Sequence, residues 1–425
     1  MGSTAAAVMI EGGNRNTDWF KWCEEGHILD GSHVMRGIDH WNRYADDIKI
    51  MKELNHDSCC MSVEWSRIEP EKGKYDLEAI KHYRDEISLL LQNGIKPLVS
   101  LYHFSLPLWL AEMGGWENPE IVDIFVQFTR FVLNQLGDLV SDWITINDAN
   151  LTLVCGYLWA WWPPGKKDAG AMVRASRNMS ISHIKGYQEI HKIRAEKKYP
   201  GTTKVGLSLH LRVLDPIDDK FMNKLMAKMV DYFMIDVILA AMTTGKFGFP
   251  LGLGGYPVGK GKFYDFIGVN YFTRDMVSFK LNPAKMFFEL RFKEGAETND
   301  GGWEIYPEGM YRVCKKVYAK YKVPLYITEN GIYNVADDKK PKFIYDNLWQ
   351  IHRLIQEGIP VERYYHWTLI DLFECHSGER CRLGLVENDF ETQTRTIRRS
   401  GRLYGEICGK KAVTQEMIKK YLSGK

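Results

Sequence analysis

The sequence predicts an α/β fold, a (β/α)8 TIM barrel formed by residues 1–425 as one domain. Short apolar runs alternate with amphipathic helical stretches along the whole chain, as in barrels and other parallel α/β folds. No repeat, low-complexity segment or linker divides the chain, and 425 residues suffice for one large barrel. A doubly wound sheet would carry a glycine-rich phosphate turn after its first strand, and residues 10–14 (Ile-Glu-Gly-Gly-Asn) lack that pattern.

The eight predicted strands are short apolar runs bounded by polar or turn residues. In chain order they are residues 3–8, 59–63, 96–101, 142–146, 204–209, 263–269, 323–328 and 362–366. Between strands, residues 117–136 predict a helix, because apolar side chains recur on one stripe. A second helix is predicted after Pro307, where Met310, Val313 and Val317 share a face. The first strand lies so close to the start of the chain that we expect its beginning to be missing.

The composition argues against several classes of partner. Lys and Arg total 56 and Asp and Glu total 54, so the net charge of +2 gives no reason to expect nucleic acid or an anionic membrane. We find no secretory leader and no run of 18 apolar residues. The eight cysteines form neither zinc spacing nor a dense disulfide framework, and Cys375, His376 and Cys381 are the nearest approach to a metal-binding set. We therefore expect a cytoplasmic protein without metal or cofactor.

Two carboxylates stand out because each ends an apolar strand. Glu329 closes the run Tyr-Ile-Thr-Glu and is followed by an Asn-Gly turn, and Asp148 closes Trp-Ile-Thr-Ile-Asn-Asp. The simplest alternative is that each acid caps the segment that follows it. Barrel enzymes, however, carry their chemistry at the carboxyl ends of the strands. Two carboxylates at such positions suit glycoside hydrolysis, which uses one as nucleophile or base and one as acid.

The chain resembles glycoside hydrolase family 1, the retaining β-glycosidases, over essentially its whole length. That family has a (β/α)8 fold, which agrees with the strand count. The residues that carry the resemblance lie in nine ordered segments. They are residues 10–12, 64–70, 103–110, 114–116, 162–165, 265–271, 327–331, 366–367 and 390–392.

The resemblance implies a role for particular residues. Glu329 falls at the family nucleophile, which forms a covalent glycosyl-enzyme. Asp148 falls at the acid/base, where the family has Glu in the motif Asn-Glu-Pro and this chain has Asn-Asp-Ala. Five further matches imply residues that bind the sugar or orient the acids: His103, Asn147, Asn270, Trp367 and Glu374.

Several departures from the family pattern cluster at the implied site. Asp148 is one methylene shorter than Glu, which withdraws the proton donor by about 1.5 Å. Cys60 stands for an Arg and Phe272 for a Tyr, so the resemblance implies that Glu329 loses a cation and a hydrogen bond and that its pKa rises. Polar or stacking residues are also replaced at three more positions, Met9 for Gln, Leu372 for Asn and Cys375 for Trp.

Two functions are consistent with this pattern, and both expect a small-molecule substrate. One is a β-glucosidase-type hydrolase that is weakened or altered at its acid and its sugar-binding residues. The other is a repurposed or engineered barrel whose apolar pocket binds an aromatic ligand or catalyses a different reaction. The nearby Trp159, Trp161 and Trp162 fit either an aromatic wall at the entrance or simple packing. The sequence does not separate one sugar from another.

Overall fold

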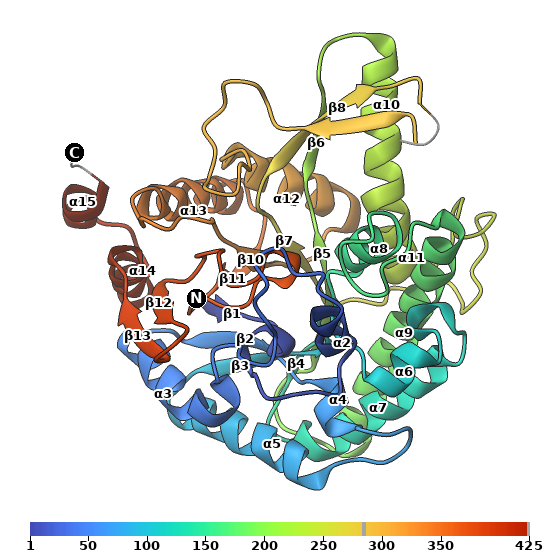
Figure 1. Cartoon of the computed structure of the whole chain (residues 1–425), viewed down its shortest axis with the longest axis horizontal. Helices are drawn as coiled ribbons and strands as arrows, with labels where there is room; N and C mark the ends of the chain where they lie inside the picture. The colour runs from blue at the N-terminus through green and yellow to red at the C-terminus, as the bar shows by residue number, and fades with distance from the viewer. Residues whose placement is uncertain (283–285, 423–425) are drawn as a thin grey trace.

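The computed structural model describes residues 1–282 and 286–422, and its centre is a closed barrel of parallel strands (Figure 1). Neighbours around the barrel run β1, β2, β3, β4, β5, β7, β10, β11 and back to β1. The bounds are β1 Gly2–Thr4, β2 Ser58–Ser62, β3 Lys96–Tyr102, β4 Asp142–Asn147, β5 Lys204–His210, β7 Phe266–Asn270, β10 Leu325–Asn330 and β11 Val361–Trp367. The predicted (β/α)8 fold is therefore confirmed.

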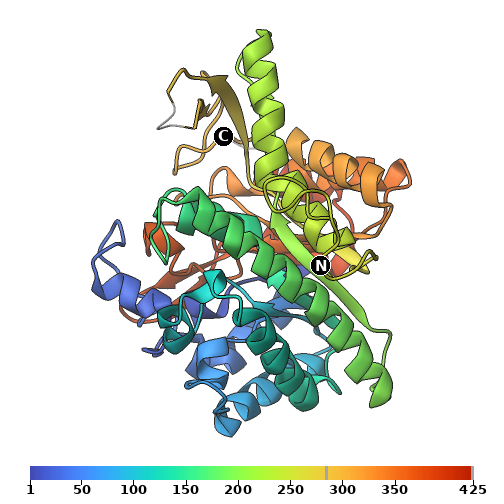
Figure 2. The same ribbon diagram turned by 90° about the vertical axis from the view of Figure 1, so that its right-hand side faces the viewer.

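Long helices surround the barrel, and Figure 2 shows several of them along its outer side. They are α3 His40–Glu53, α5 Leu77–Gln92, α7 Ile121–Leu136, α9 Ala169–Glu196, α11 Val237–Thr244, α12 Glu308–Tyr321, α13 Lys340–Gln356 and α14 Arg399–Lys410. Further helices lie in the connections. They are α1 Ala7–Ile10, α2 Asp18–Glu24, α4 Trp65–Ile68, α6 Leu108–Glu112, η1 Gly115–Glu117, α8 Ala149–Tyr157, η2 Tyr232–Asp236, η4 Cys375–Ser377, α15 Gln415–Met417 and η5 Ile418–Leu422. Within the described ranges, no helix is both long and apolar enough to span a membrane.

Two small sheets and one helix lie outside the barrel. The helix α10 (Phe221–Asp231) packs on a three-stranded sheet that projects beyond the barrel (Figure 1). Its strands are β6 Val213–Pro216, β8 Arg274–Phe279 and β9 Phe288–Arg291, in the order β6-β8-β9. The other sheet is the hairpin β12 Val386–Asp389 and β13 Thr394–Ile397.

The side chains inside the barrel form layers. One apolar cluster draws its members from six barrel strands, which places it within the barrel: Cys60, Leu98, Ile144, Phe266, Tyr326 and Tyr365. Nearer the amino ends of the strands, the buried carboxylate of Asp142 forms ion pairs with Lys96 at 3.0 Å and Arg363 at 2.6 Å. In barrels of this kind, ligands bind at the carboxyl ends of the strands.

Most predicted strands differ from the observed ones by one to three residues at an end, including the strand predicted at residues 263–269, which is β7 at Phe266–Asn270. Three differences, one of them in a helix, have a clear local cause or bear on the site. The strand predicted at residues 3–8 ends at Thr4, and the alanine-rich stretch after it turns into α1, whose first N–H is donated by Ala7 to Ser62 Oγ at 2.8 Å. The helix predicted from residue 117 begins at Ile121, because Pro119 interrupts it. The strand predicted at residues 323–328 extends to Asn330, so Glu329 lies within β10.

Candidate functional site

The carboxyl ends of three strands bring His103, Asn147 and Glu329 together. Asn147 ends β4 and donates its amide Nδ2 to Glu329 Oε1 at 2.8 Å. Asn147 Nδ2 also lies 2.8 Å from Nε2 of His103, the residue after β3. This His103 Nε2 atom is 3.4 Å from Glu329 Oε1. All three side chains are buried, with at most 5% of each residue exposed. Asn147 therefore fixes the position of the Glu329 carboxyl group relative to His103.

Asp148 lies on the other side of Asn147 and has a strained backbone. It adopts the left-handed conformation, with φ 51° and ψ 44°, at the point where β4 turns into α8. Its Oδ1 accepts a hydrogen bond from Asn270 Nδ2 at 2.7 Å, and Thr328 donates to the carbonyl oxygen of the same amide. Asn270 Nδ2 is also 3.4 Å from Asn147 Oδ1, so two asparagines link the two acids.

Irregular strand pairing accompanies both acids. The register between β10 and β7 shifts between Ile327 and Glu329, and the register between β4 and β5 shifts between Ile144 and Asn147. Such irregularities redirect side chains and are frequent beside active sites. Here they occur on the two strands whose carboxyl ends carry Glu329 and Asp148.

The two acids perturb each other's ionisation. Burial raises the pKa of Glu329 well above its usual value, the nearby Asp148 raises it further, and the hydrogen bond from Asn147 lowers it. Burial raises the pKa of Asp148 to about 8, although the Asn270 hydrogen bond lowers it. Among residues 1–282 and 286–422, no Lys or Arg forms an ion pair with Glu329. Burial therefore opposes the ionisation of both carboxyl groups, and the charge of one opposes that of the other.

Trp367 and Glu374 lie beside this network. Trp367 ends β11, and its indole Nε1 donates to Glu374 Oε2 at 3.1 Å. Burial raises the pKa of Glu374 to about 7, while the hydrogen bond from Trp367 lowers it. The Trp367 ring is 5.9 Å from the His103 ring, which places the indole next to the histidine. All seven residues matched to the family nucleophile, acid/base and sugar-binding positions thus lie near the carboxyl ends of the strands.

The replaced positions do not all lie in one place. Cys60 belongs to the apolar cluster inside the barrel, where burial raises its thiol pKa to about 12 and the nearby Glu329 charge adds to the effect. Met9 is buried in α1, and its carbonyl oxygen accepts from the backbone of Phe373 at 3.4 Å. Cys375 is buried next to Glu374. The buried Cys60, Met9 and Cys375 add no charge near Glu329, because burial holds both thiols in the neutral form.

Phe272 lies two residues beyond β7 and contacts the acid side of the site. Its ring stacks on the imidazole of His210, with centroids 5.6 Å apart and planes 17° apart, and meets Trp303 edge-on at 6.4 Å. The contact with His210 places this ring on the Asp148 side of the barrel. The sequence had implied a Tyr-to-Phe change that affects the nucleophile.

Three residues of the site were not predicted from the sequence: His210, Asn150 and Thr328. His210 is the last residue of β5, so the same strand-end rule that selected Asn147 would have selected it. Asn150 is in the first turn of α8 and exchanges two hydrogen bonds with the His210 backbone, at 2.8 and 3.0 Å. Thr328 carried no separate signal, because a threonine in a strand is ordinary.

Aromatic rings cover the approach to His103. Phe104 contacts the His103 ring at 4.5 Å and the Trp162 ring at 4.7 Å. Trp19 meets Trp162 at 5.6 Å and donates its indole N–H to the Phe104 carbonyl at 3.2 Å. Trp162 is therefore a packed residue, whereas Trp161 is 47% exposed.

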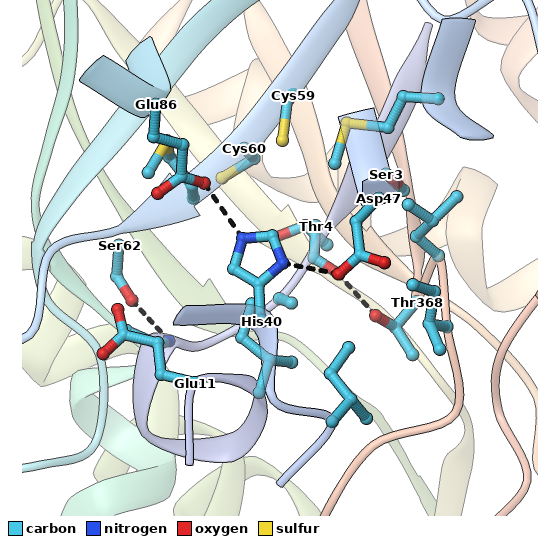
Figure 3. Close-up of a pocket in the computed structure, with 18 residues that line it drawn as sticks. Ser3, Thr4, Glu11, His40, Asp47, Cys59, Cys60, Ser62, Glu86 and Thr368 are labelled. Atoms are coloured by element: carbon cyan, nitrogen blue, oxygen red, sulfur yellow. Dashed lines mark hydrogen bonds and ion pairs between the residues drawn. The ribbon is translucent and has the colours of Figure 1, made fainter. Parts of the chain in front are cut away.

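A cavity of about 40 Å³ lies on the outer side of β1 and β2, apart from the two acids (Figure 3). His40 crosses it, with Nδ1 2.8 Å from Asp47 Oδ2 and Nε2 2.9 Å from Glu86 Oε1. Burial alone would lower the pKa of His40, but the charge of Glu86 and the hydrogen bonds that the imidazole donates to both carboxylates raise it to about 10. Neither Glu329 nor Asp148 lines this cavity, and its volume suits a few water molecules rather than a sugar.

Comparison with known proteins gives a consistent result. The family model "Glycosyl hydrolase family 1" matches residues 1–251 and 260–413. "Beta-glucosidase A" of Acetivibrio thermocellus is 31% identical, with 96% of each chain covered, and "Beta-galactosidase" of Pyrococcus woesei is 28% identical over 96% of this chain and 94% of its own. A solved "beta-glycosidase from Pyrococcus horikoshii" superposes with a TM-score of 0.91 at 33% identity, covering 99% of this chain and 96% of its own.

Proposed function

Because the chain belongs to glycosyl hydrolase family 1, we propose that it hydrolyses β-glycosides by the retaining mechanism, with Glu329 as nucleophile and Asp148 as acid and base. The chain is a β-glucosidase- or β-galactosidase-like hydrolase, and the retaining mechanism and these two roles are our proposal. One observation supports the proposal most directly. Asn147 and Asn270 connect Glu329 to Asp148 at the carboxyl ends of the strands.

The first step takes a proton from one carboxyl group and forms a bond with the other. Retaining glycosidases need one ionised and one protonated carboxyl group, and neighbouring carboxyls favour such a state because two charges repel. Asp148 would give its proton to the glycosidic oxygen while the bond from that oxygen to the anomeric carbon breaks. A Glu329 oxygen would form the new bond to the same carbon. Asn147 donates to the Glu329 oxygen Oε1 and would orient the carboxylate for this attack.

The second step reverses these roles. The Asp148 carboxylate would take a proton from water, the water oxygen would bond to the anomeric carbon, and the bond to Glu329 would break. His103 and Trp367 would contact the sugar beside Glu329, because His103 is 3.4 Å from Oε1 and the two rings are 5.9 Å apart. Glu374, held by Trp367, would accept a sugar hydroxyl hydrogen bond.

The sugar-binding assignment also has support from structural neighbours. A Thermotoga maritima β-glucosidase, 26% identical with a TM-score of 0.90, was solved with castanospermine, and the same enzyme was solved with deoxynojirimycin. We propose that this chain binds the non-reducing sugar of a β-glycoside at the corresponding position.

The test measures hydrolysis of aryl β-glucosides and β-galactosides, with Glu329→Gln as the isosteric control. We expect turnover by the wild type, loss of at least about 10³-fold in Glu329→Gln, and covalent labelling of Glu329 by an activated 2-deoxy-2-fluoro glycoside. Labelling of another residue would refute the assignment of the nucleophile. No turnover and no labelling would instead favour the altered barrel that binds an apolar or aromatic ligand.

A further inference from the structure

Two buried polar atoms beside the acid face each other without hydrogen-bond partners. Oδ2 of Asp148 and Nδ1 of His210 are 4.0 Å apart, and neither forms a hydrogen bond within the described residues. Buried polar atoms in folded proteins are nearly always paired, so an unpaired one calls for an explanation. These two atoms are 4.0 Å apart, so a movement of about 1 Å would bring them within hydrogen-bond distance.

Backbone contacts hold both side chains in place. Asp148 N–H donates to the carbonyl of Ser208, two residues before His210, at 2.9 Å. Asn150, two residues after Asp148, donates to the His210 carbonyl at 2.8 Å and accepts from the His210 N–H at 3.0 Å. Phe272 covers one face of the imidazole. Hydrogen bonds between residues 148–150 and residues 208–210 therefore hold the two backbones side by side. A small side-chain rotation would bring the carboxyl group and the imidazole into a hydrogen bond.

We propose that His210 is a positioning residue for Asp148: its neutral imidazole accepts the hydrogen bond of the protonated carboxyl group and keeps the proton on Asp148 until a glycosidic oxygen takes it. The inference rests on the proposed function, in which Asp148 is the acid. The imidazole neither gains nor loses a proton in the cycle. The proton passes from Oδ2 to the leaving oxygen, and Asp148 later regains one from water.

Burial, with the charge of Arg212, favours the neutral form of His210. Burial lowers the pKa of His210 to about 3, and the charge of Arg212 lowers it as well. Arg212 forms an ion pair with Asp275 at 3.0 Å, and the charge of Asp148 raises the pKa of the second acid, Glu329. A neutral imidazole that accepts from the protonated acid favours the protonated form, so His210 should raise the pKa of Asp148.

The test compares His210→Phe and His210→Gln with the wild type. Phenylalanine keeps a ring that can stack on Phe272 but has no nitrogen, whereas glutamine keeps a polar acceptor. The matched control is His191→Phe, because His191 bonds Asp265 at 2.8 Å on the outer helix α9. In His210→Phe we expect the alkaline limb of kcat/KM to move about one pH unit lower, the effect of one hydrogen bond to the neutral acid. His210→Gln should restore part of this shift, and His191→Phe should leave the limb in place.

A second readout does not depend on activity. The infrared carbonyl band of protonated Asp148 is identified as the band that Asp148→Asn removes. The pH at which this band reaches half of its full intensity is then measured in each variant. We expect a lower midpoint in His210→Phe. An unchanged midpoint and an unchanged alkaline limb would overturn the role of His210. If the wild type proves inactive and Glu329 is not labelled, the proposed function fails, and the infrared midpoint still tests the contact between His210 and Asp148.

Discussion

Lengthening the acid by one methylene is the most informative perturbation of this site. Asp148→Glu would extend the carboxyl group by about 1.5 Å. One oxygen of Asp148 is held by Asn270 at 2.7 Å, and the other is unpaired and 4.0 Å from His210. The longer side chain should bring the acid closer to the glycosidic oxygen and to His210. We expect a higher kcat/KM for glycosides whose leaving group needs a proton.

Asp148→Glu should change both the rate of hydrolysis and the stability of the protein. A well-placed general acid contributes roughly 10²–10⁴-fold, and a donor set back by about 1.5 Å forfeits part of that, so we expect a gain of about 10–100-fold. Asp148 is fully buried, and one additional methylene in a packed site reduces stability by about 1–3 kcal/mol. The variant should therefore be faster on demanding substrates but less stable to heat or denaturant.

The assay uses a series of aryl β-glycosides ordered by leaving-group pKa. A dinitrophenolate leaves without a proton, so its glycoside should gain less than about threefold, and the gain should grow as the leaving group becomes more basic. Asp142→Glu is the matched control, because Asp142 is equally buried in the same barrel but pairs with Lys96 and Arg363 near the amino ends of the strands.

Equal gains on all leaving groups would refute the reasoning, because they would show that Asp148 does not protonate the leaving oxygen. Asp148→Glu could also show no gain in kcat/KM while its Glu329 is still labelled by the 2-fluoro glycoside. That result would show that the length of the acid side chain does not limit the rate of hydrolysis.

Other predictions concern charge, stability and ligand choice. Cys60→Arg should lower the pKa of Glu329 and move the acid limb of kcat/KM to lower pH, whereas the uncharged Cys60→Met should not; an identical shift in both would contradict this. His40→Phe should reduce the free energy of unfolding by about 3–5 kcal/mol, because it leaves Glu86 buried without a cation and Asp47 with Arg395 alone. The pKa of His40 is raised in the folded state, so its stabilisation is complete below about pH 6.5 and is lost as pH rises through about 10, a slope that denaturant titrations should find in the wild type but not in His40→Phe. Finally, calorimetry should find tighter binding of aromatic ligands than of glucose, as the apolar replacements imply; micromolar binding of a gluconolactam without detectable aromatic binding would contradict it.

The sequence was sufficient for the strand order and for the strand-end residues of the site. The barrel strands are short apolar runs and the helices carry apolar stripes with a period of about 3.6 residues, so both leave a local pattern in the sequence. The carboxyl ends of parallel strands meet at one face, so Glu329, Asn147, Asn270 and His103 could be expected there without knowledge of any distance. The same local rule would have included His210 had the fifth strand been extended by one residue.

Tertiary structure decided which of these side chains meet. The register shifts on β4 and β10 are not encoded in a local period, because they depend on how neighbouring strands pair, and they accompany the two acids. Phe272 packs on His210, and Cys60 lies inside the barrel, because strand tilt and closure bring residues far apart in sequence into contact. The 4.0 Å approach of His210 to Asp148 joins residues 62 positions apart, and it exists only because β4 and β5 are neighbours in a closed sheet.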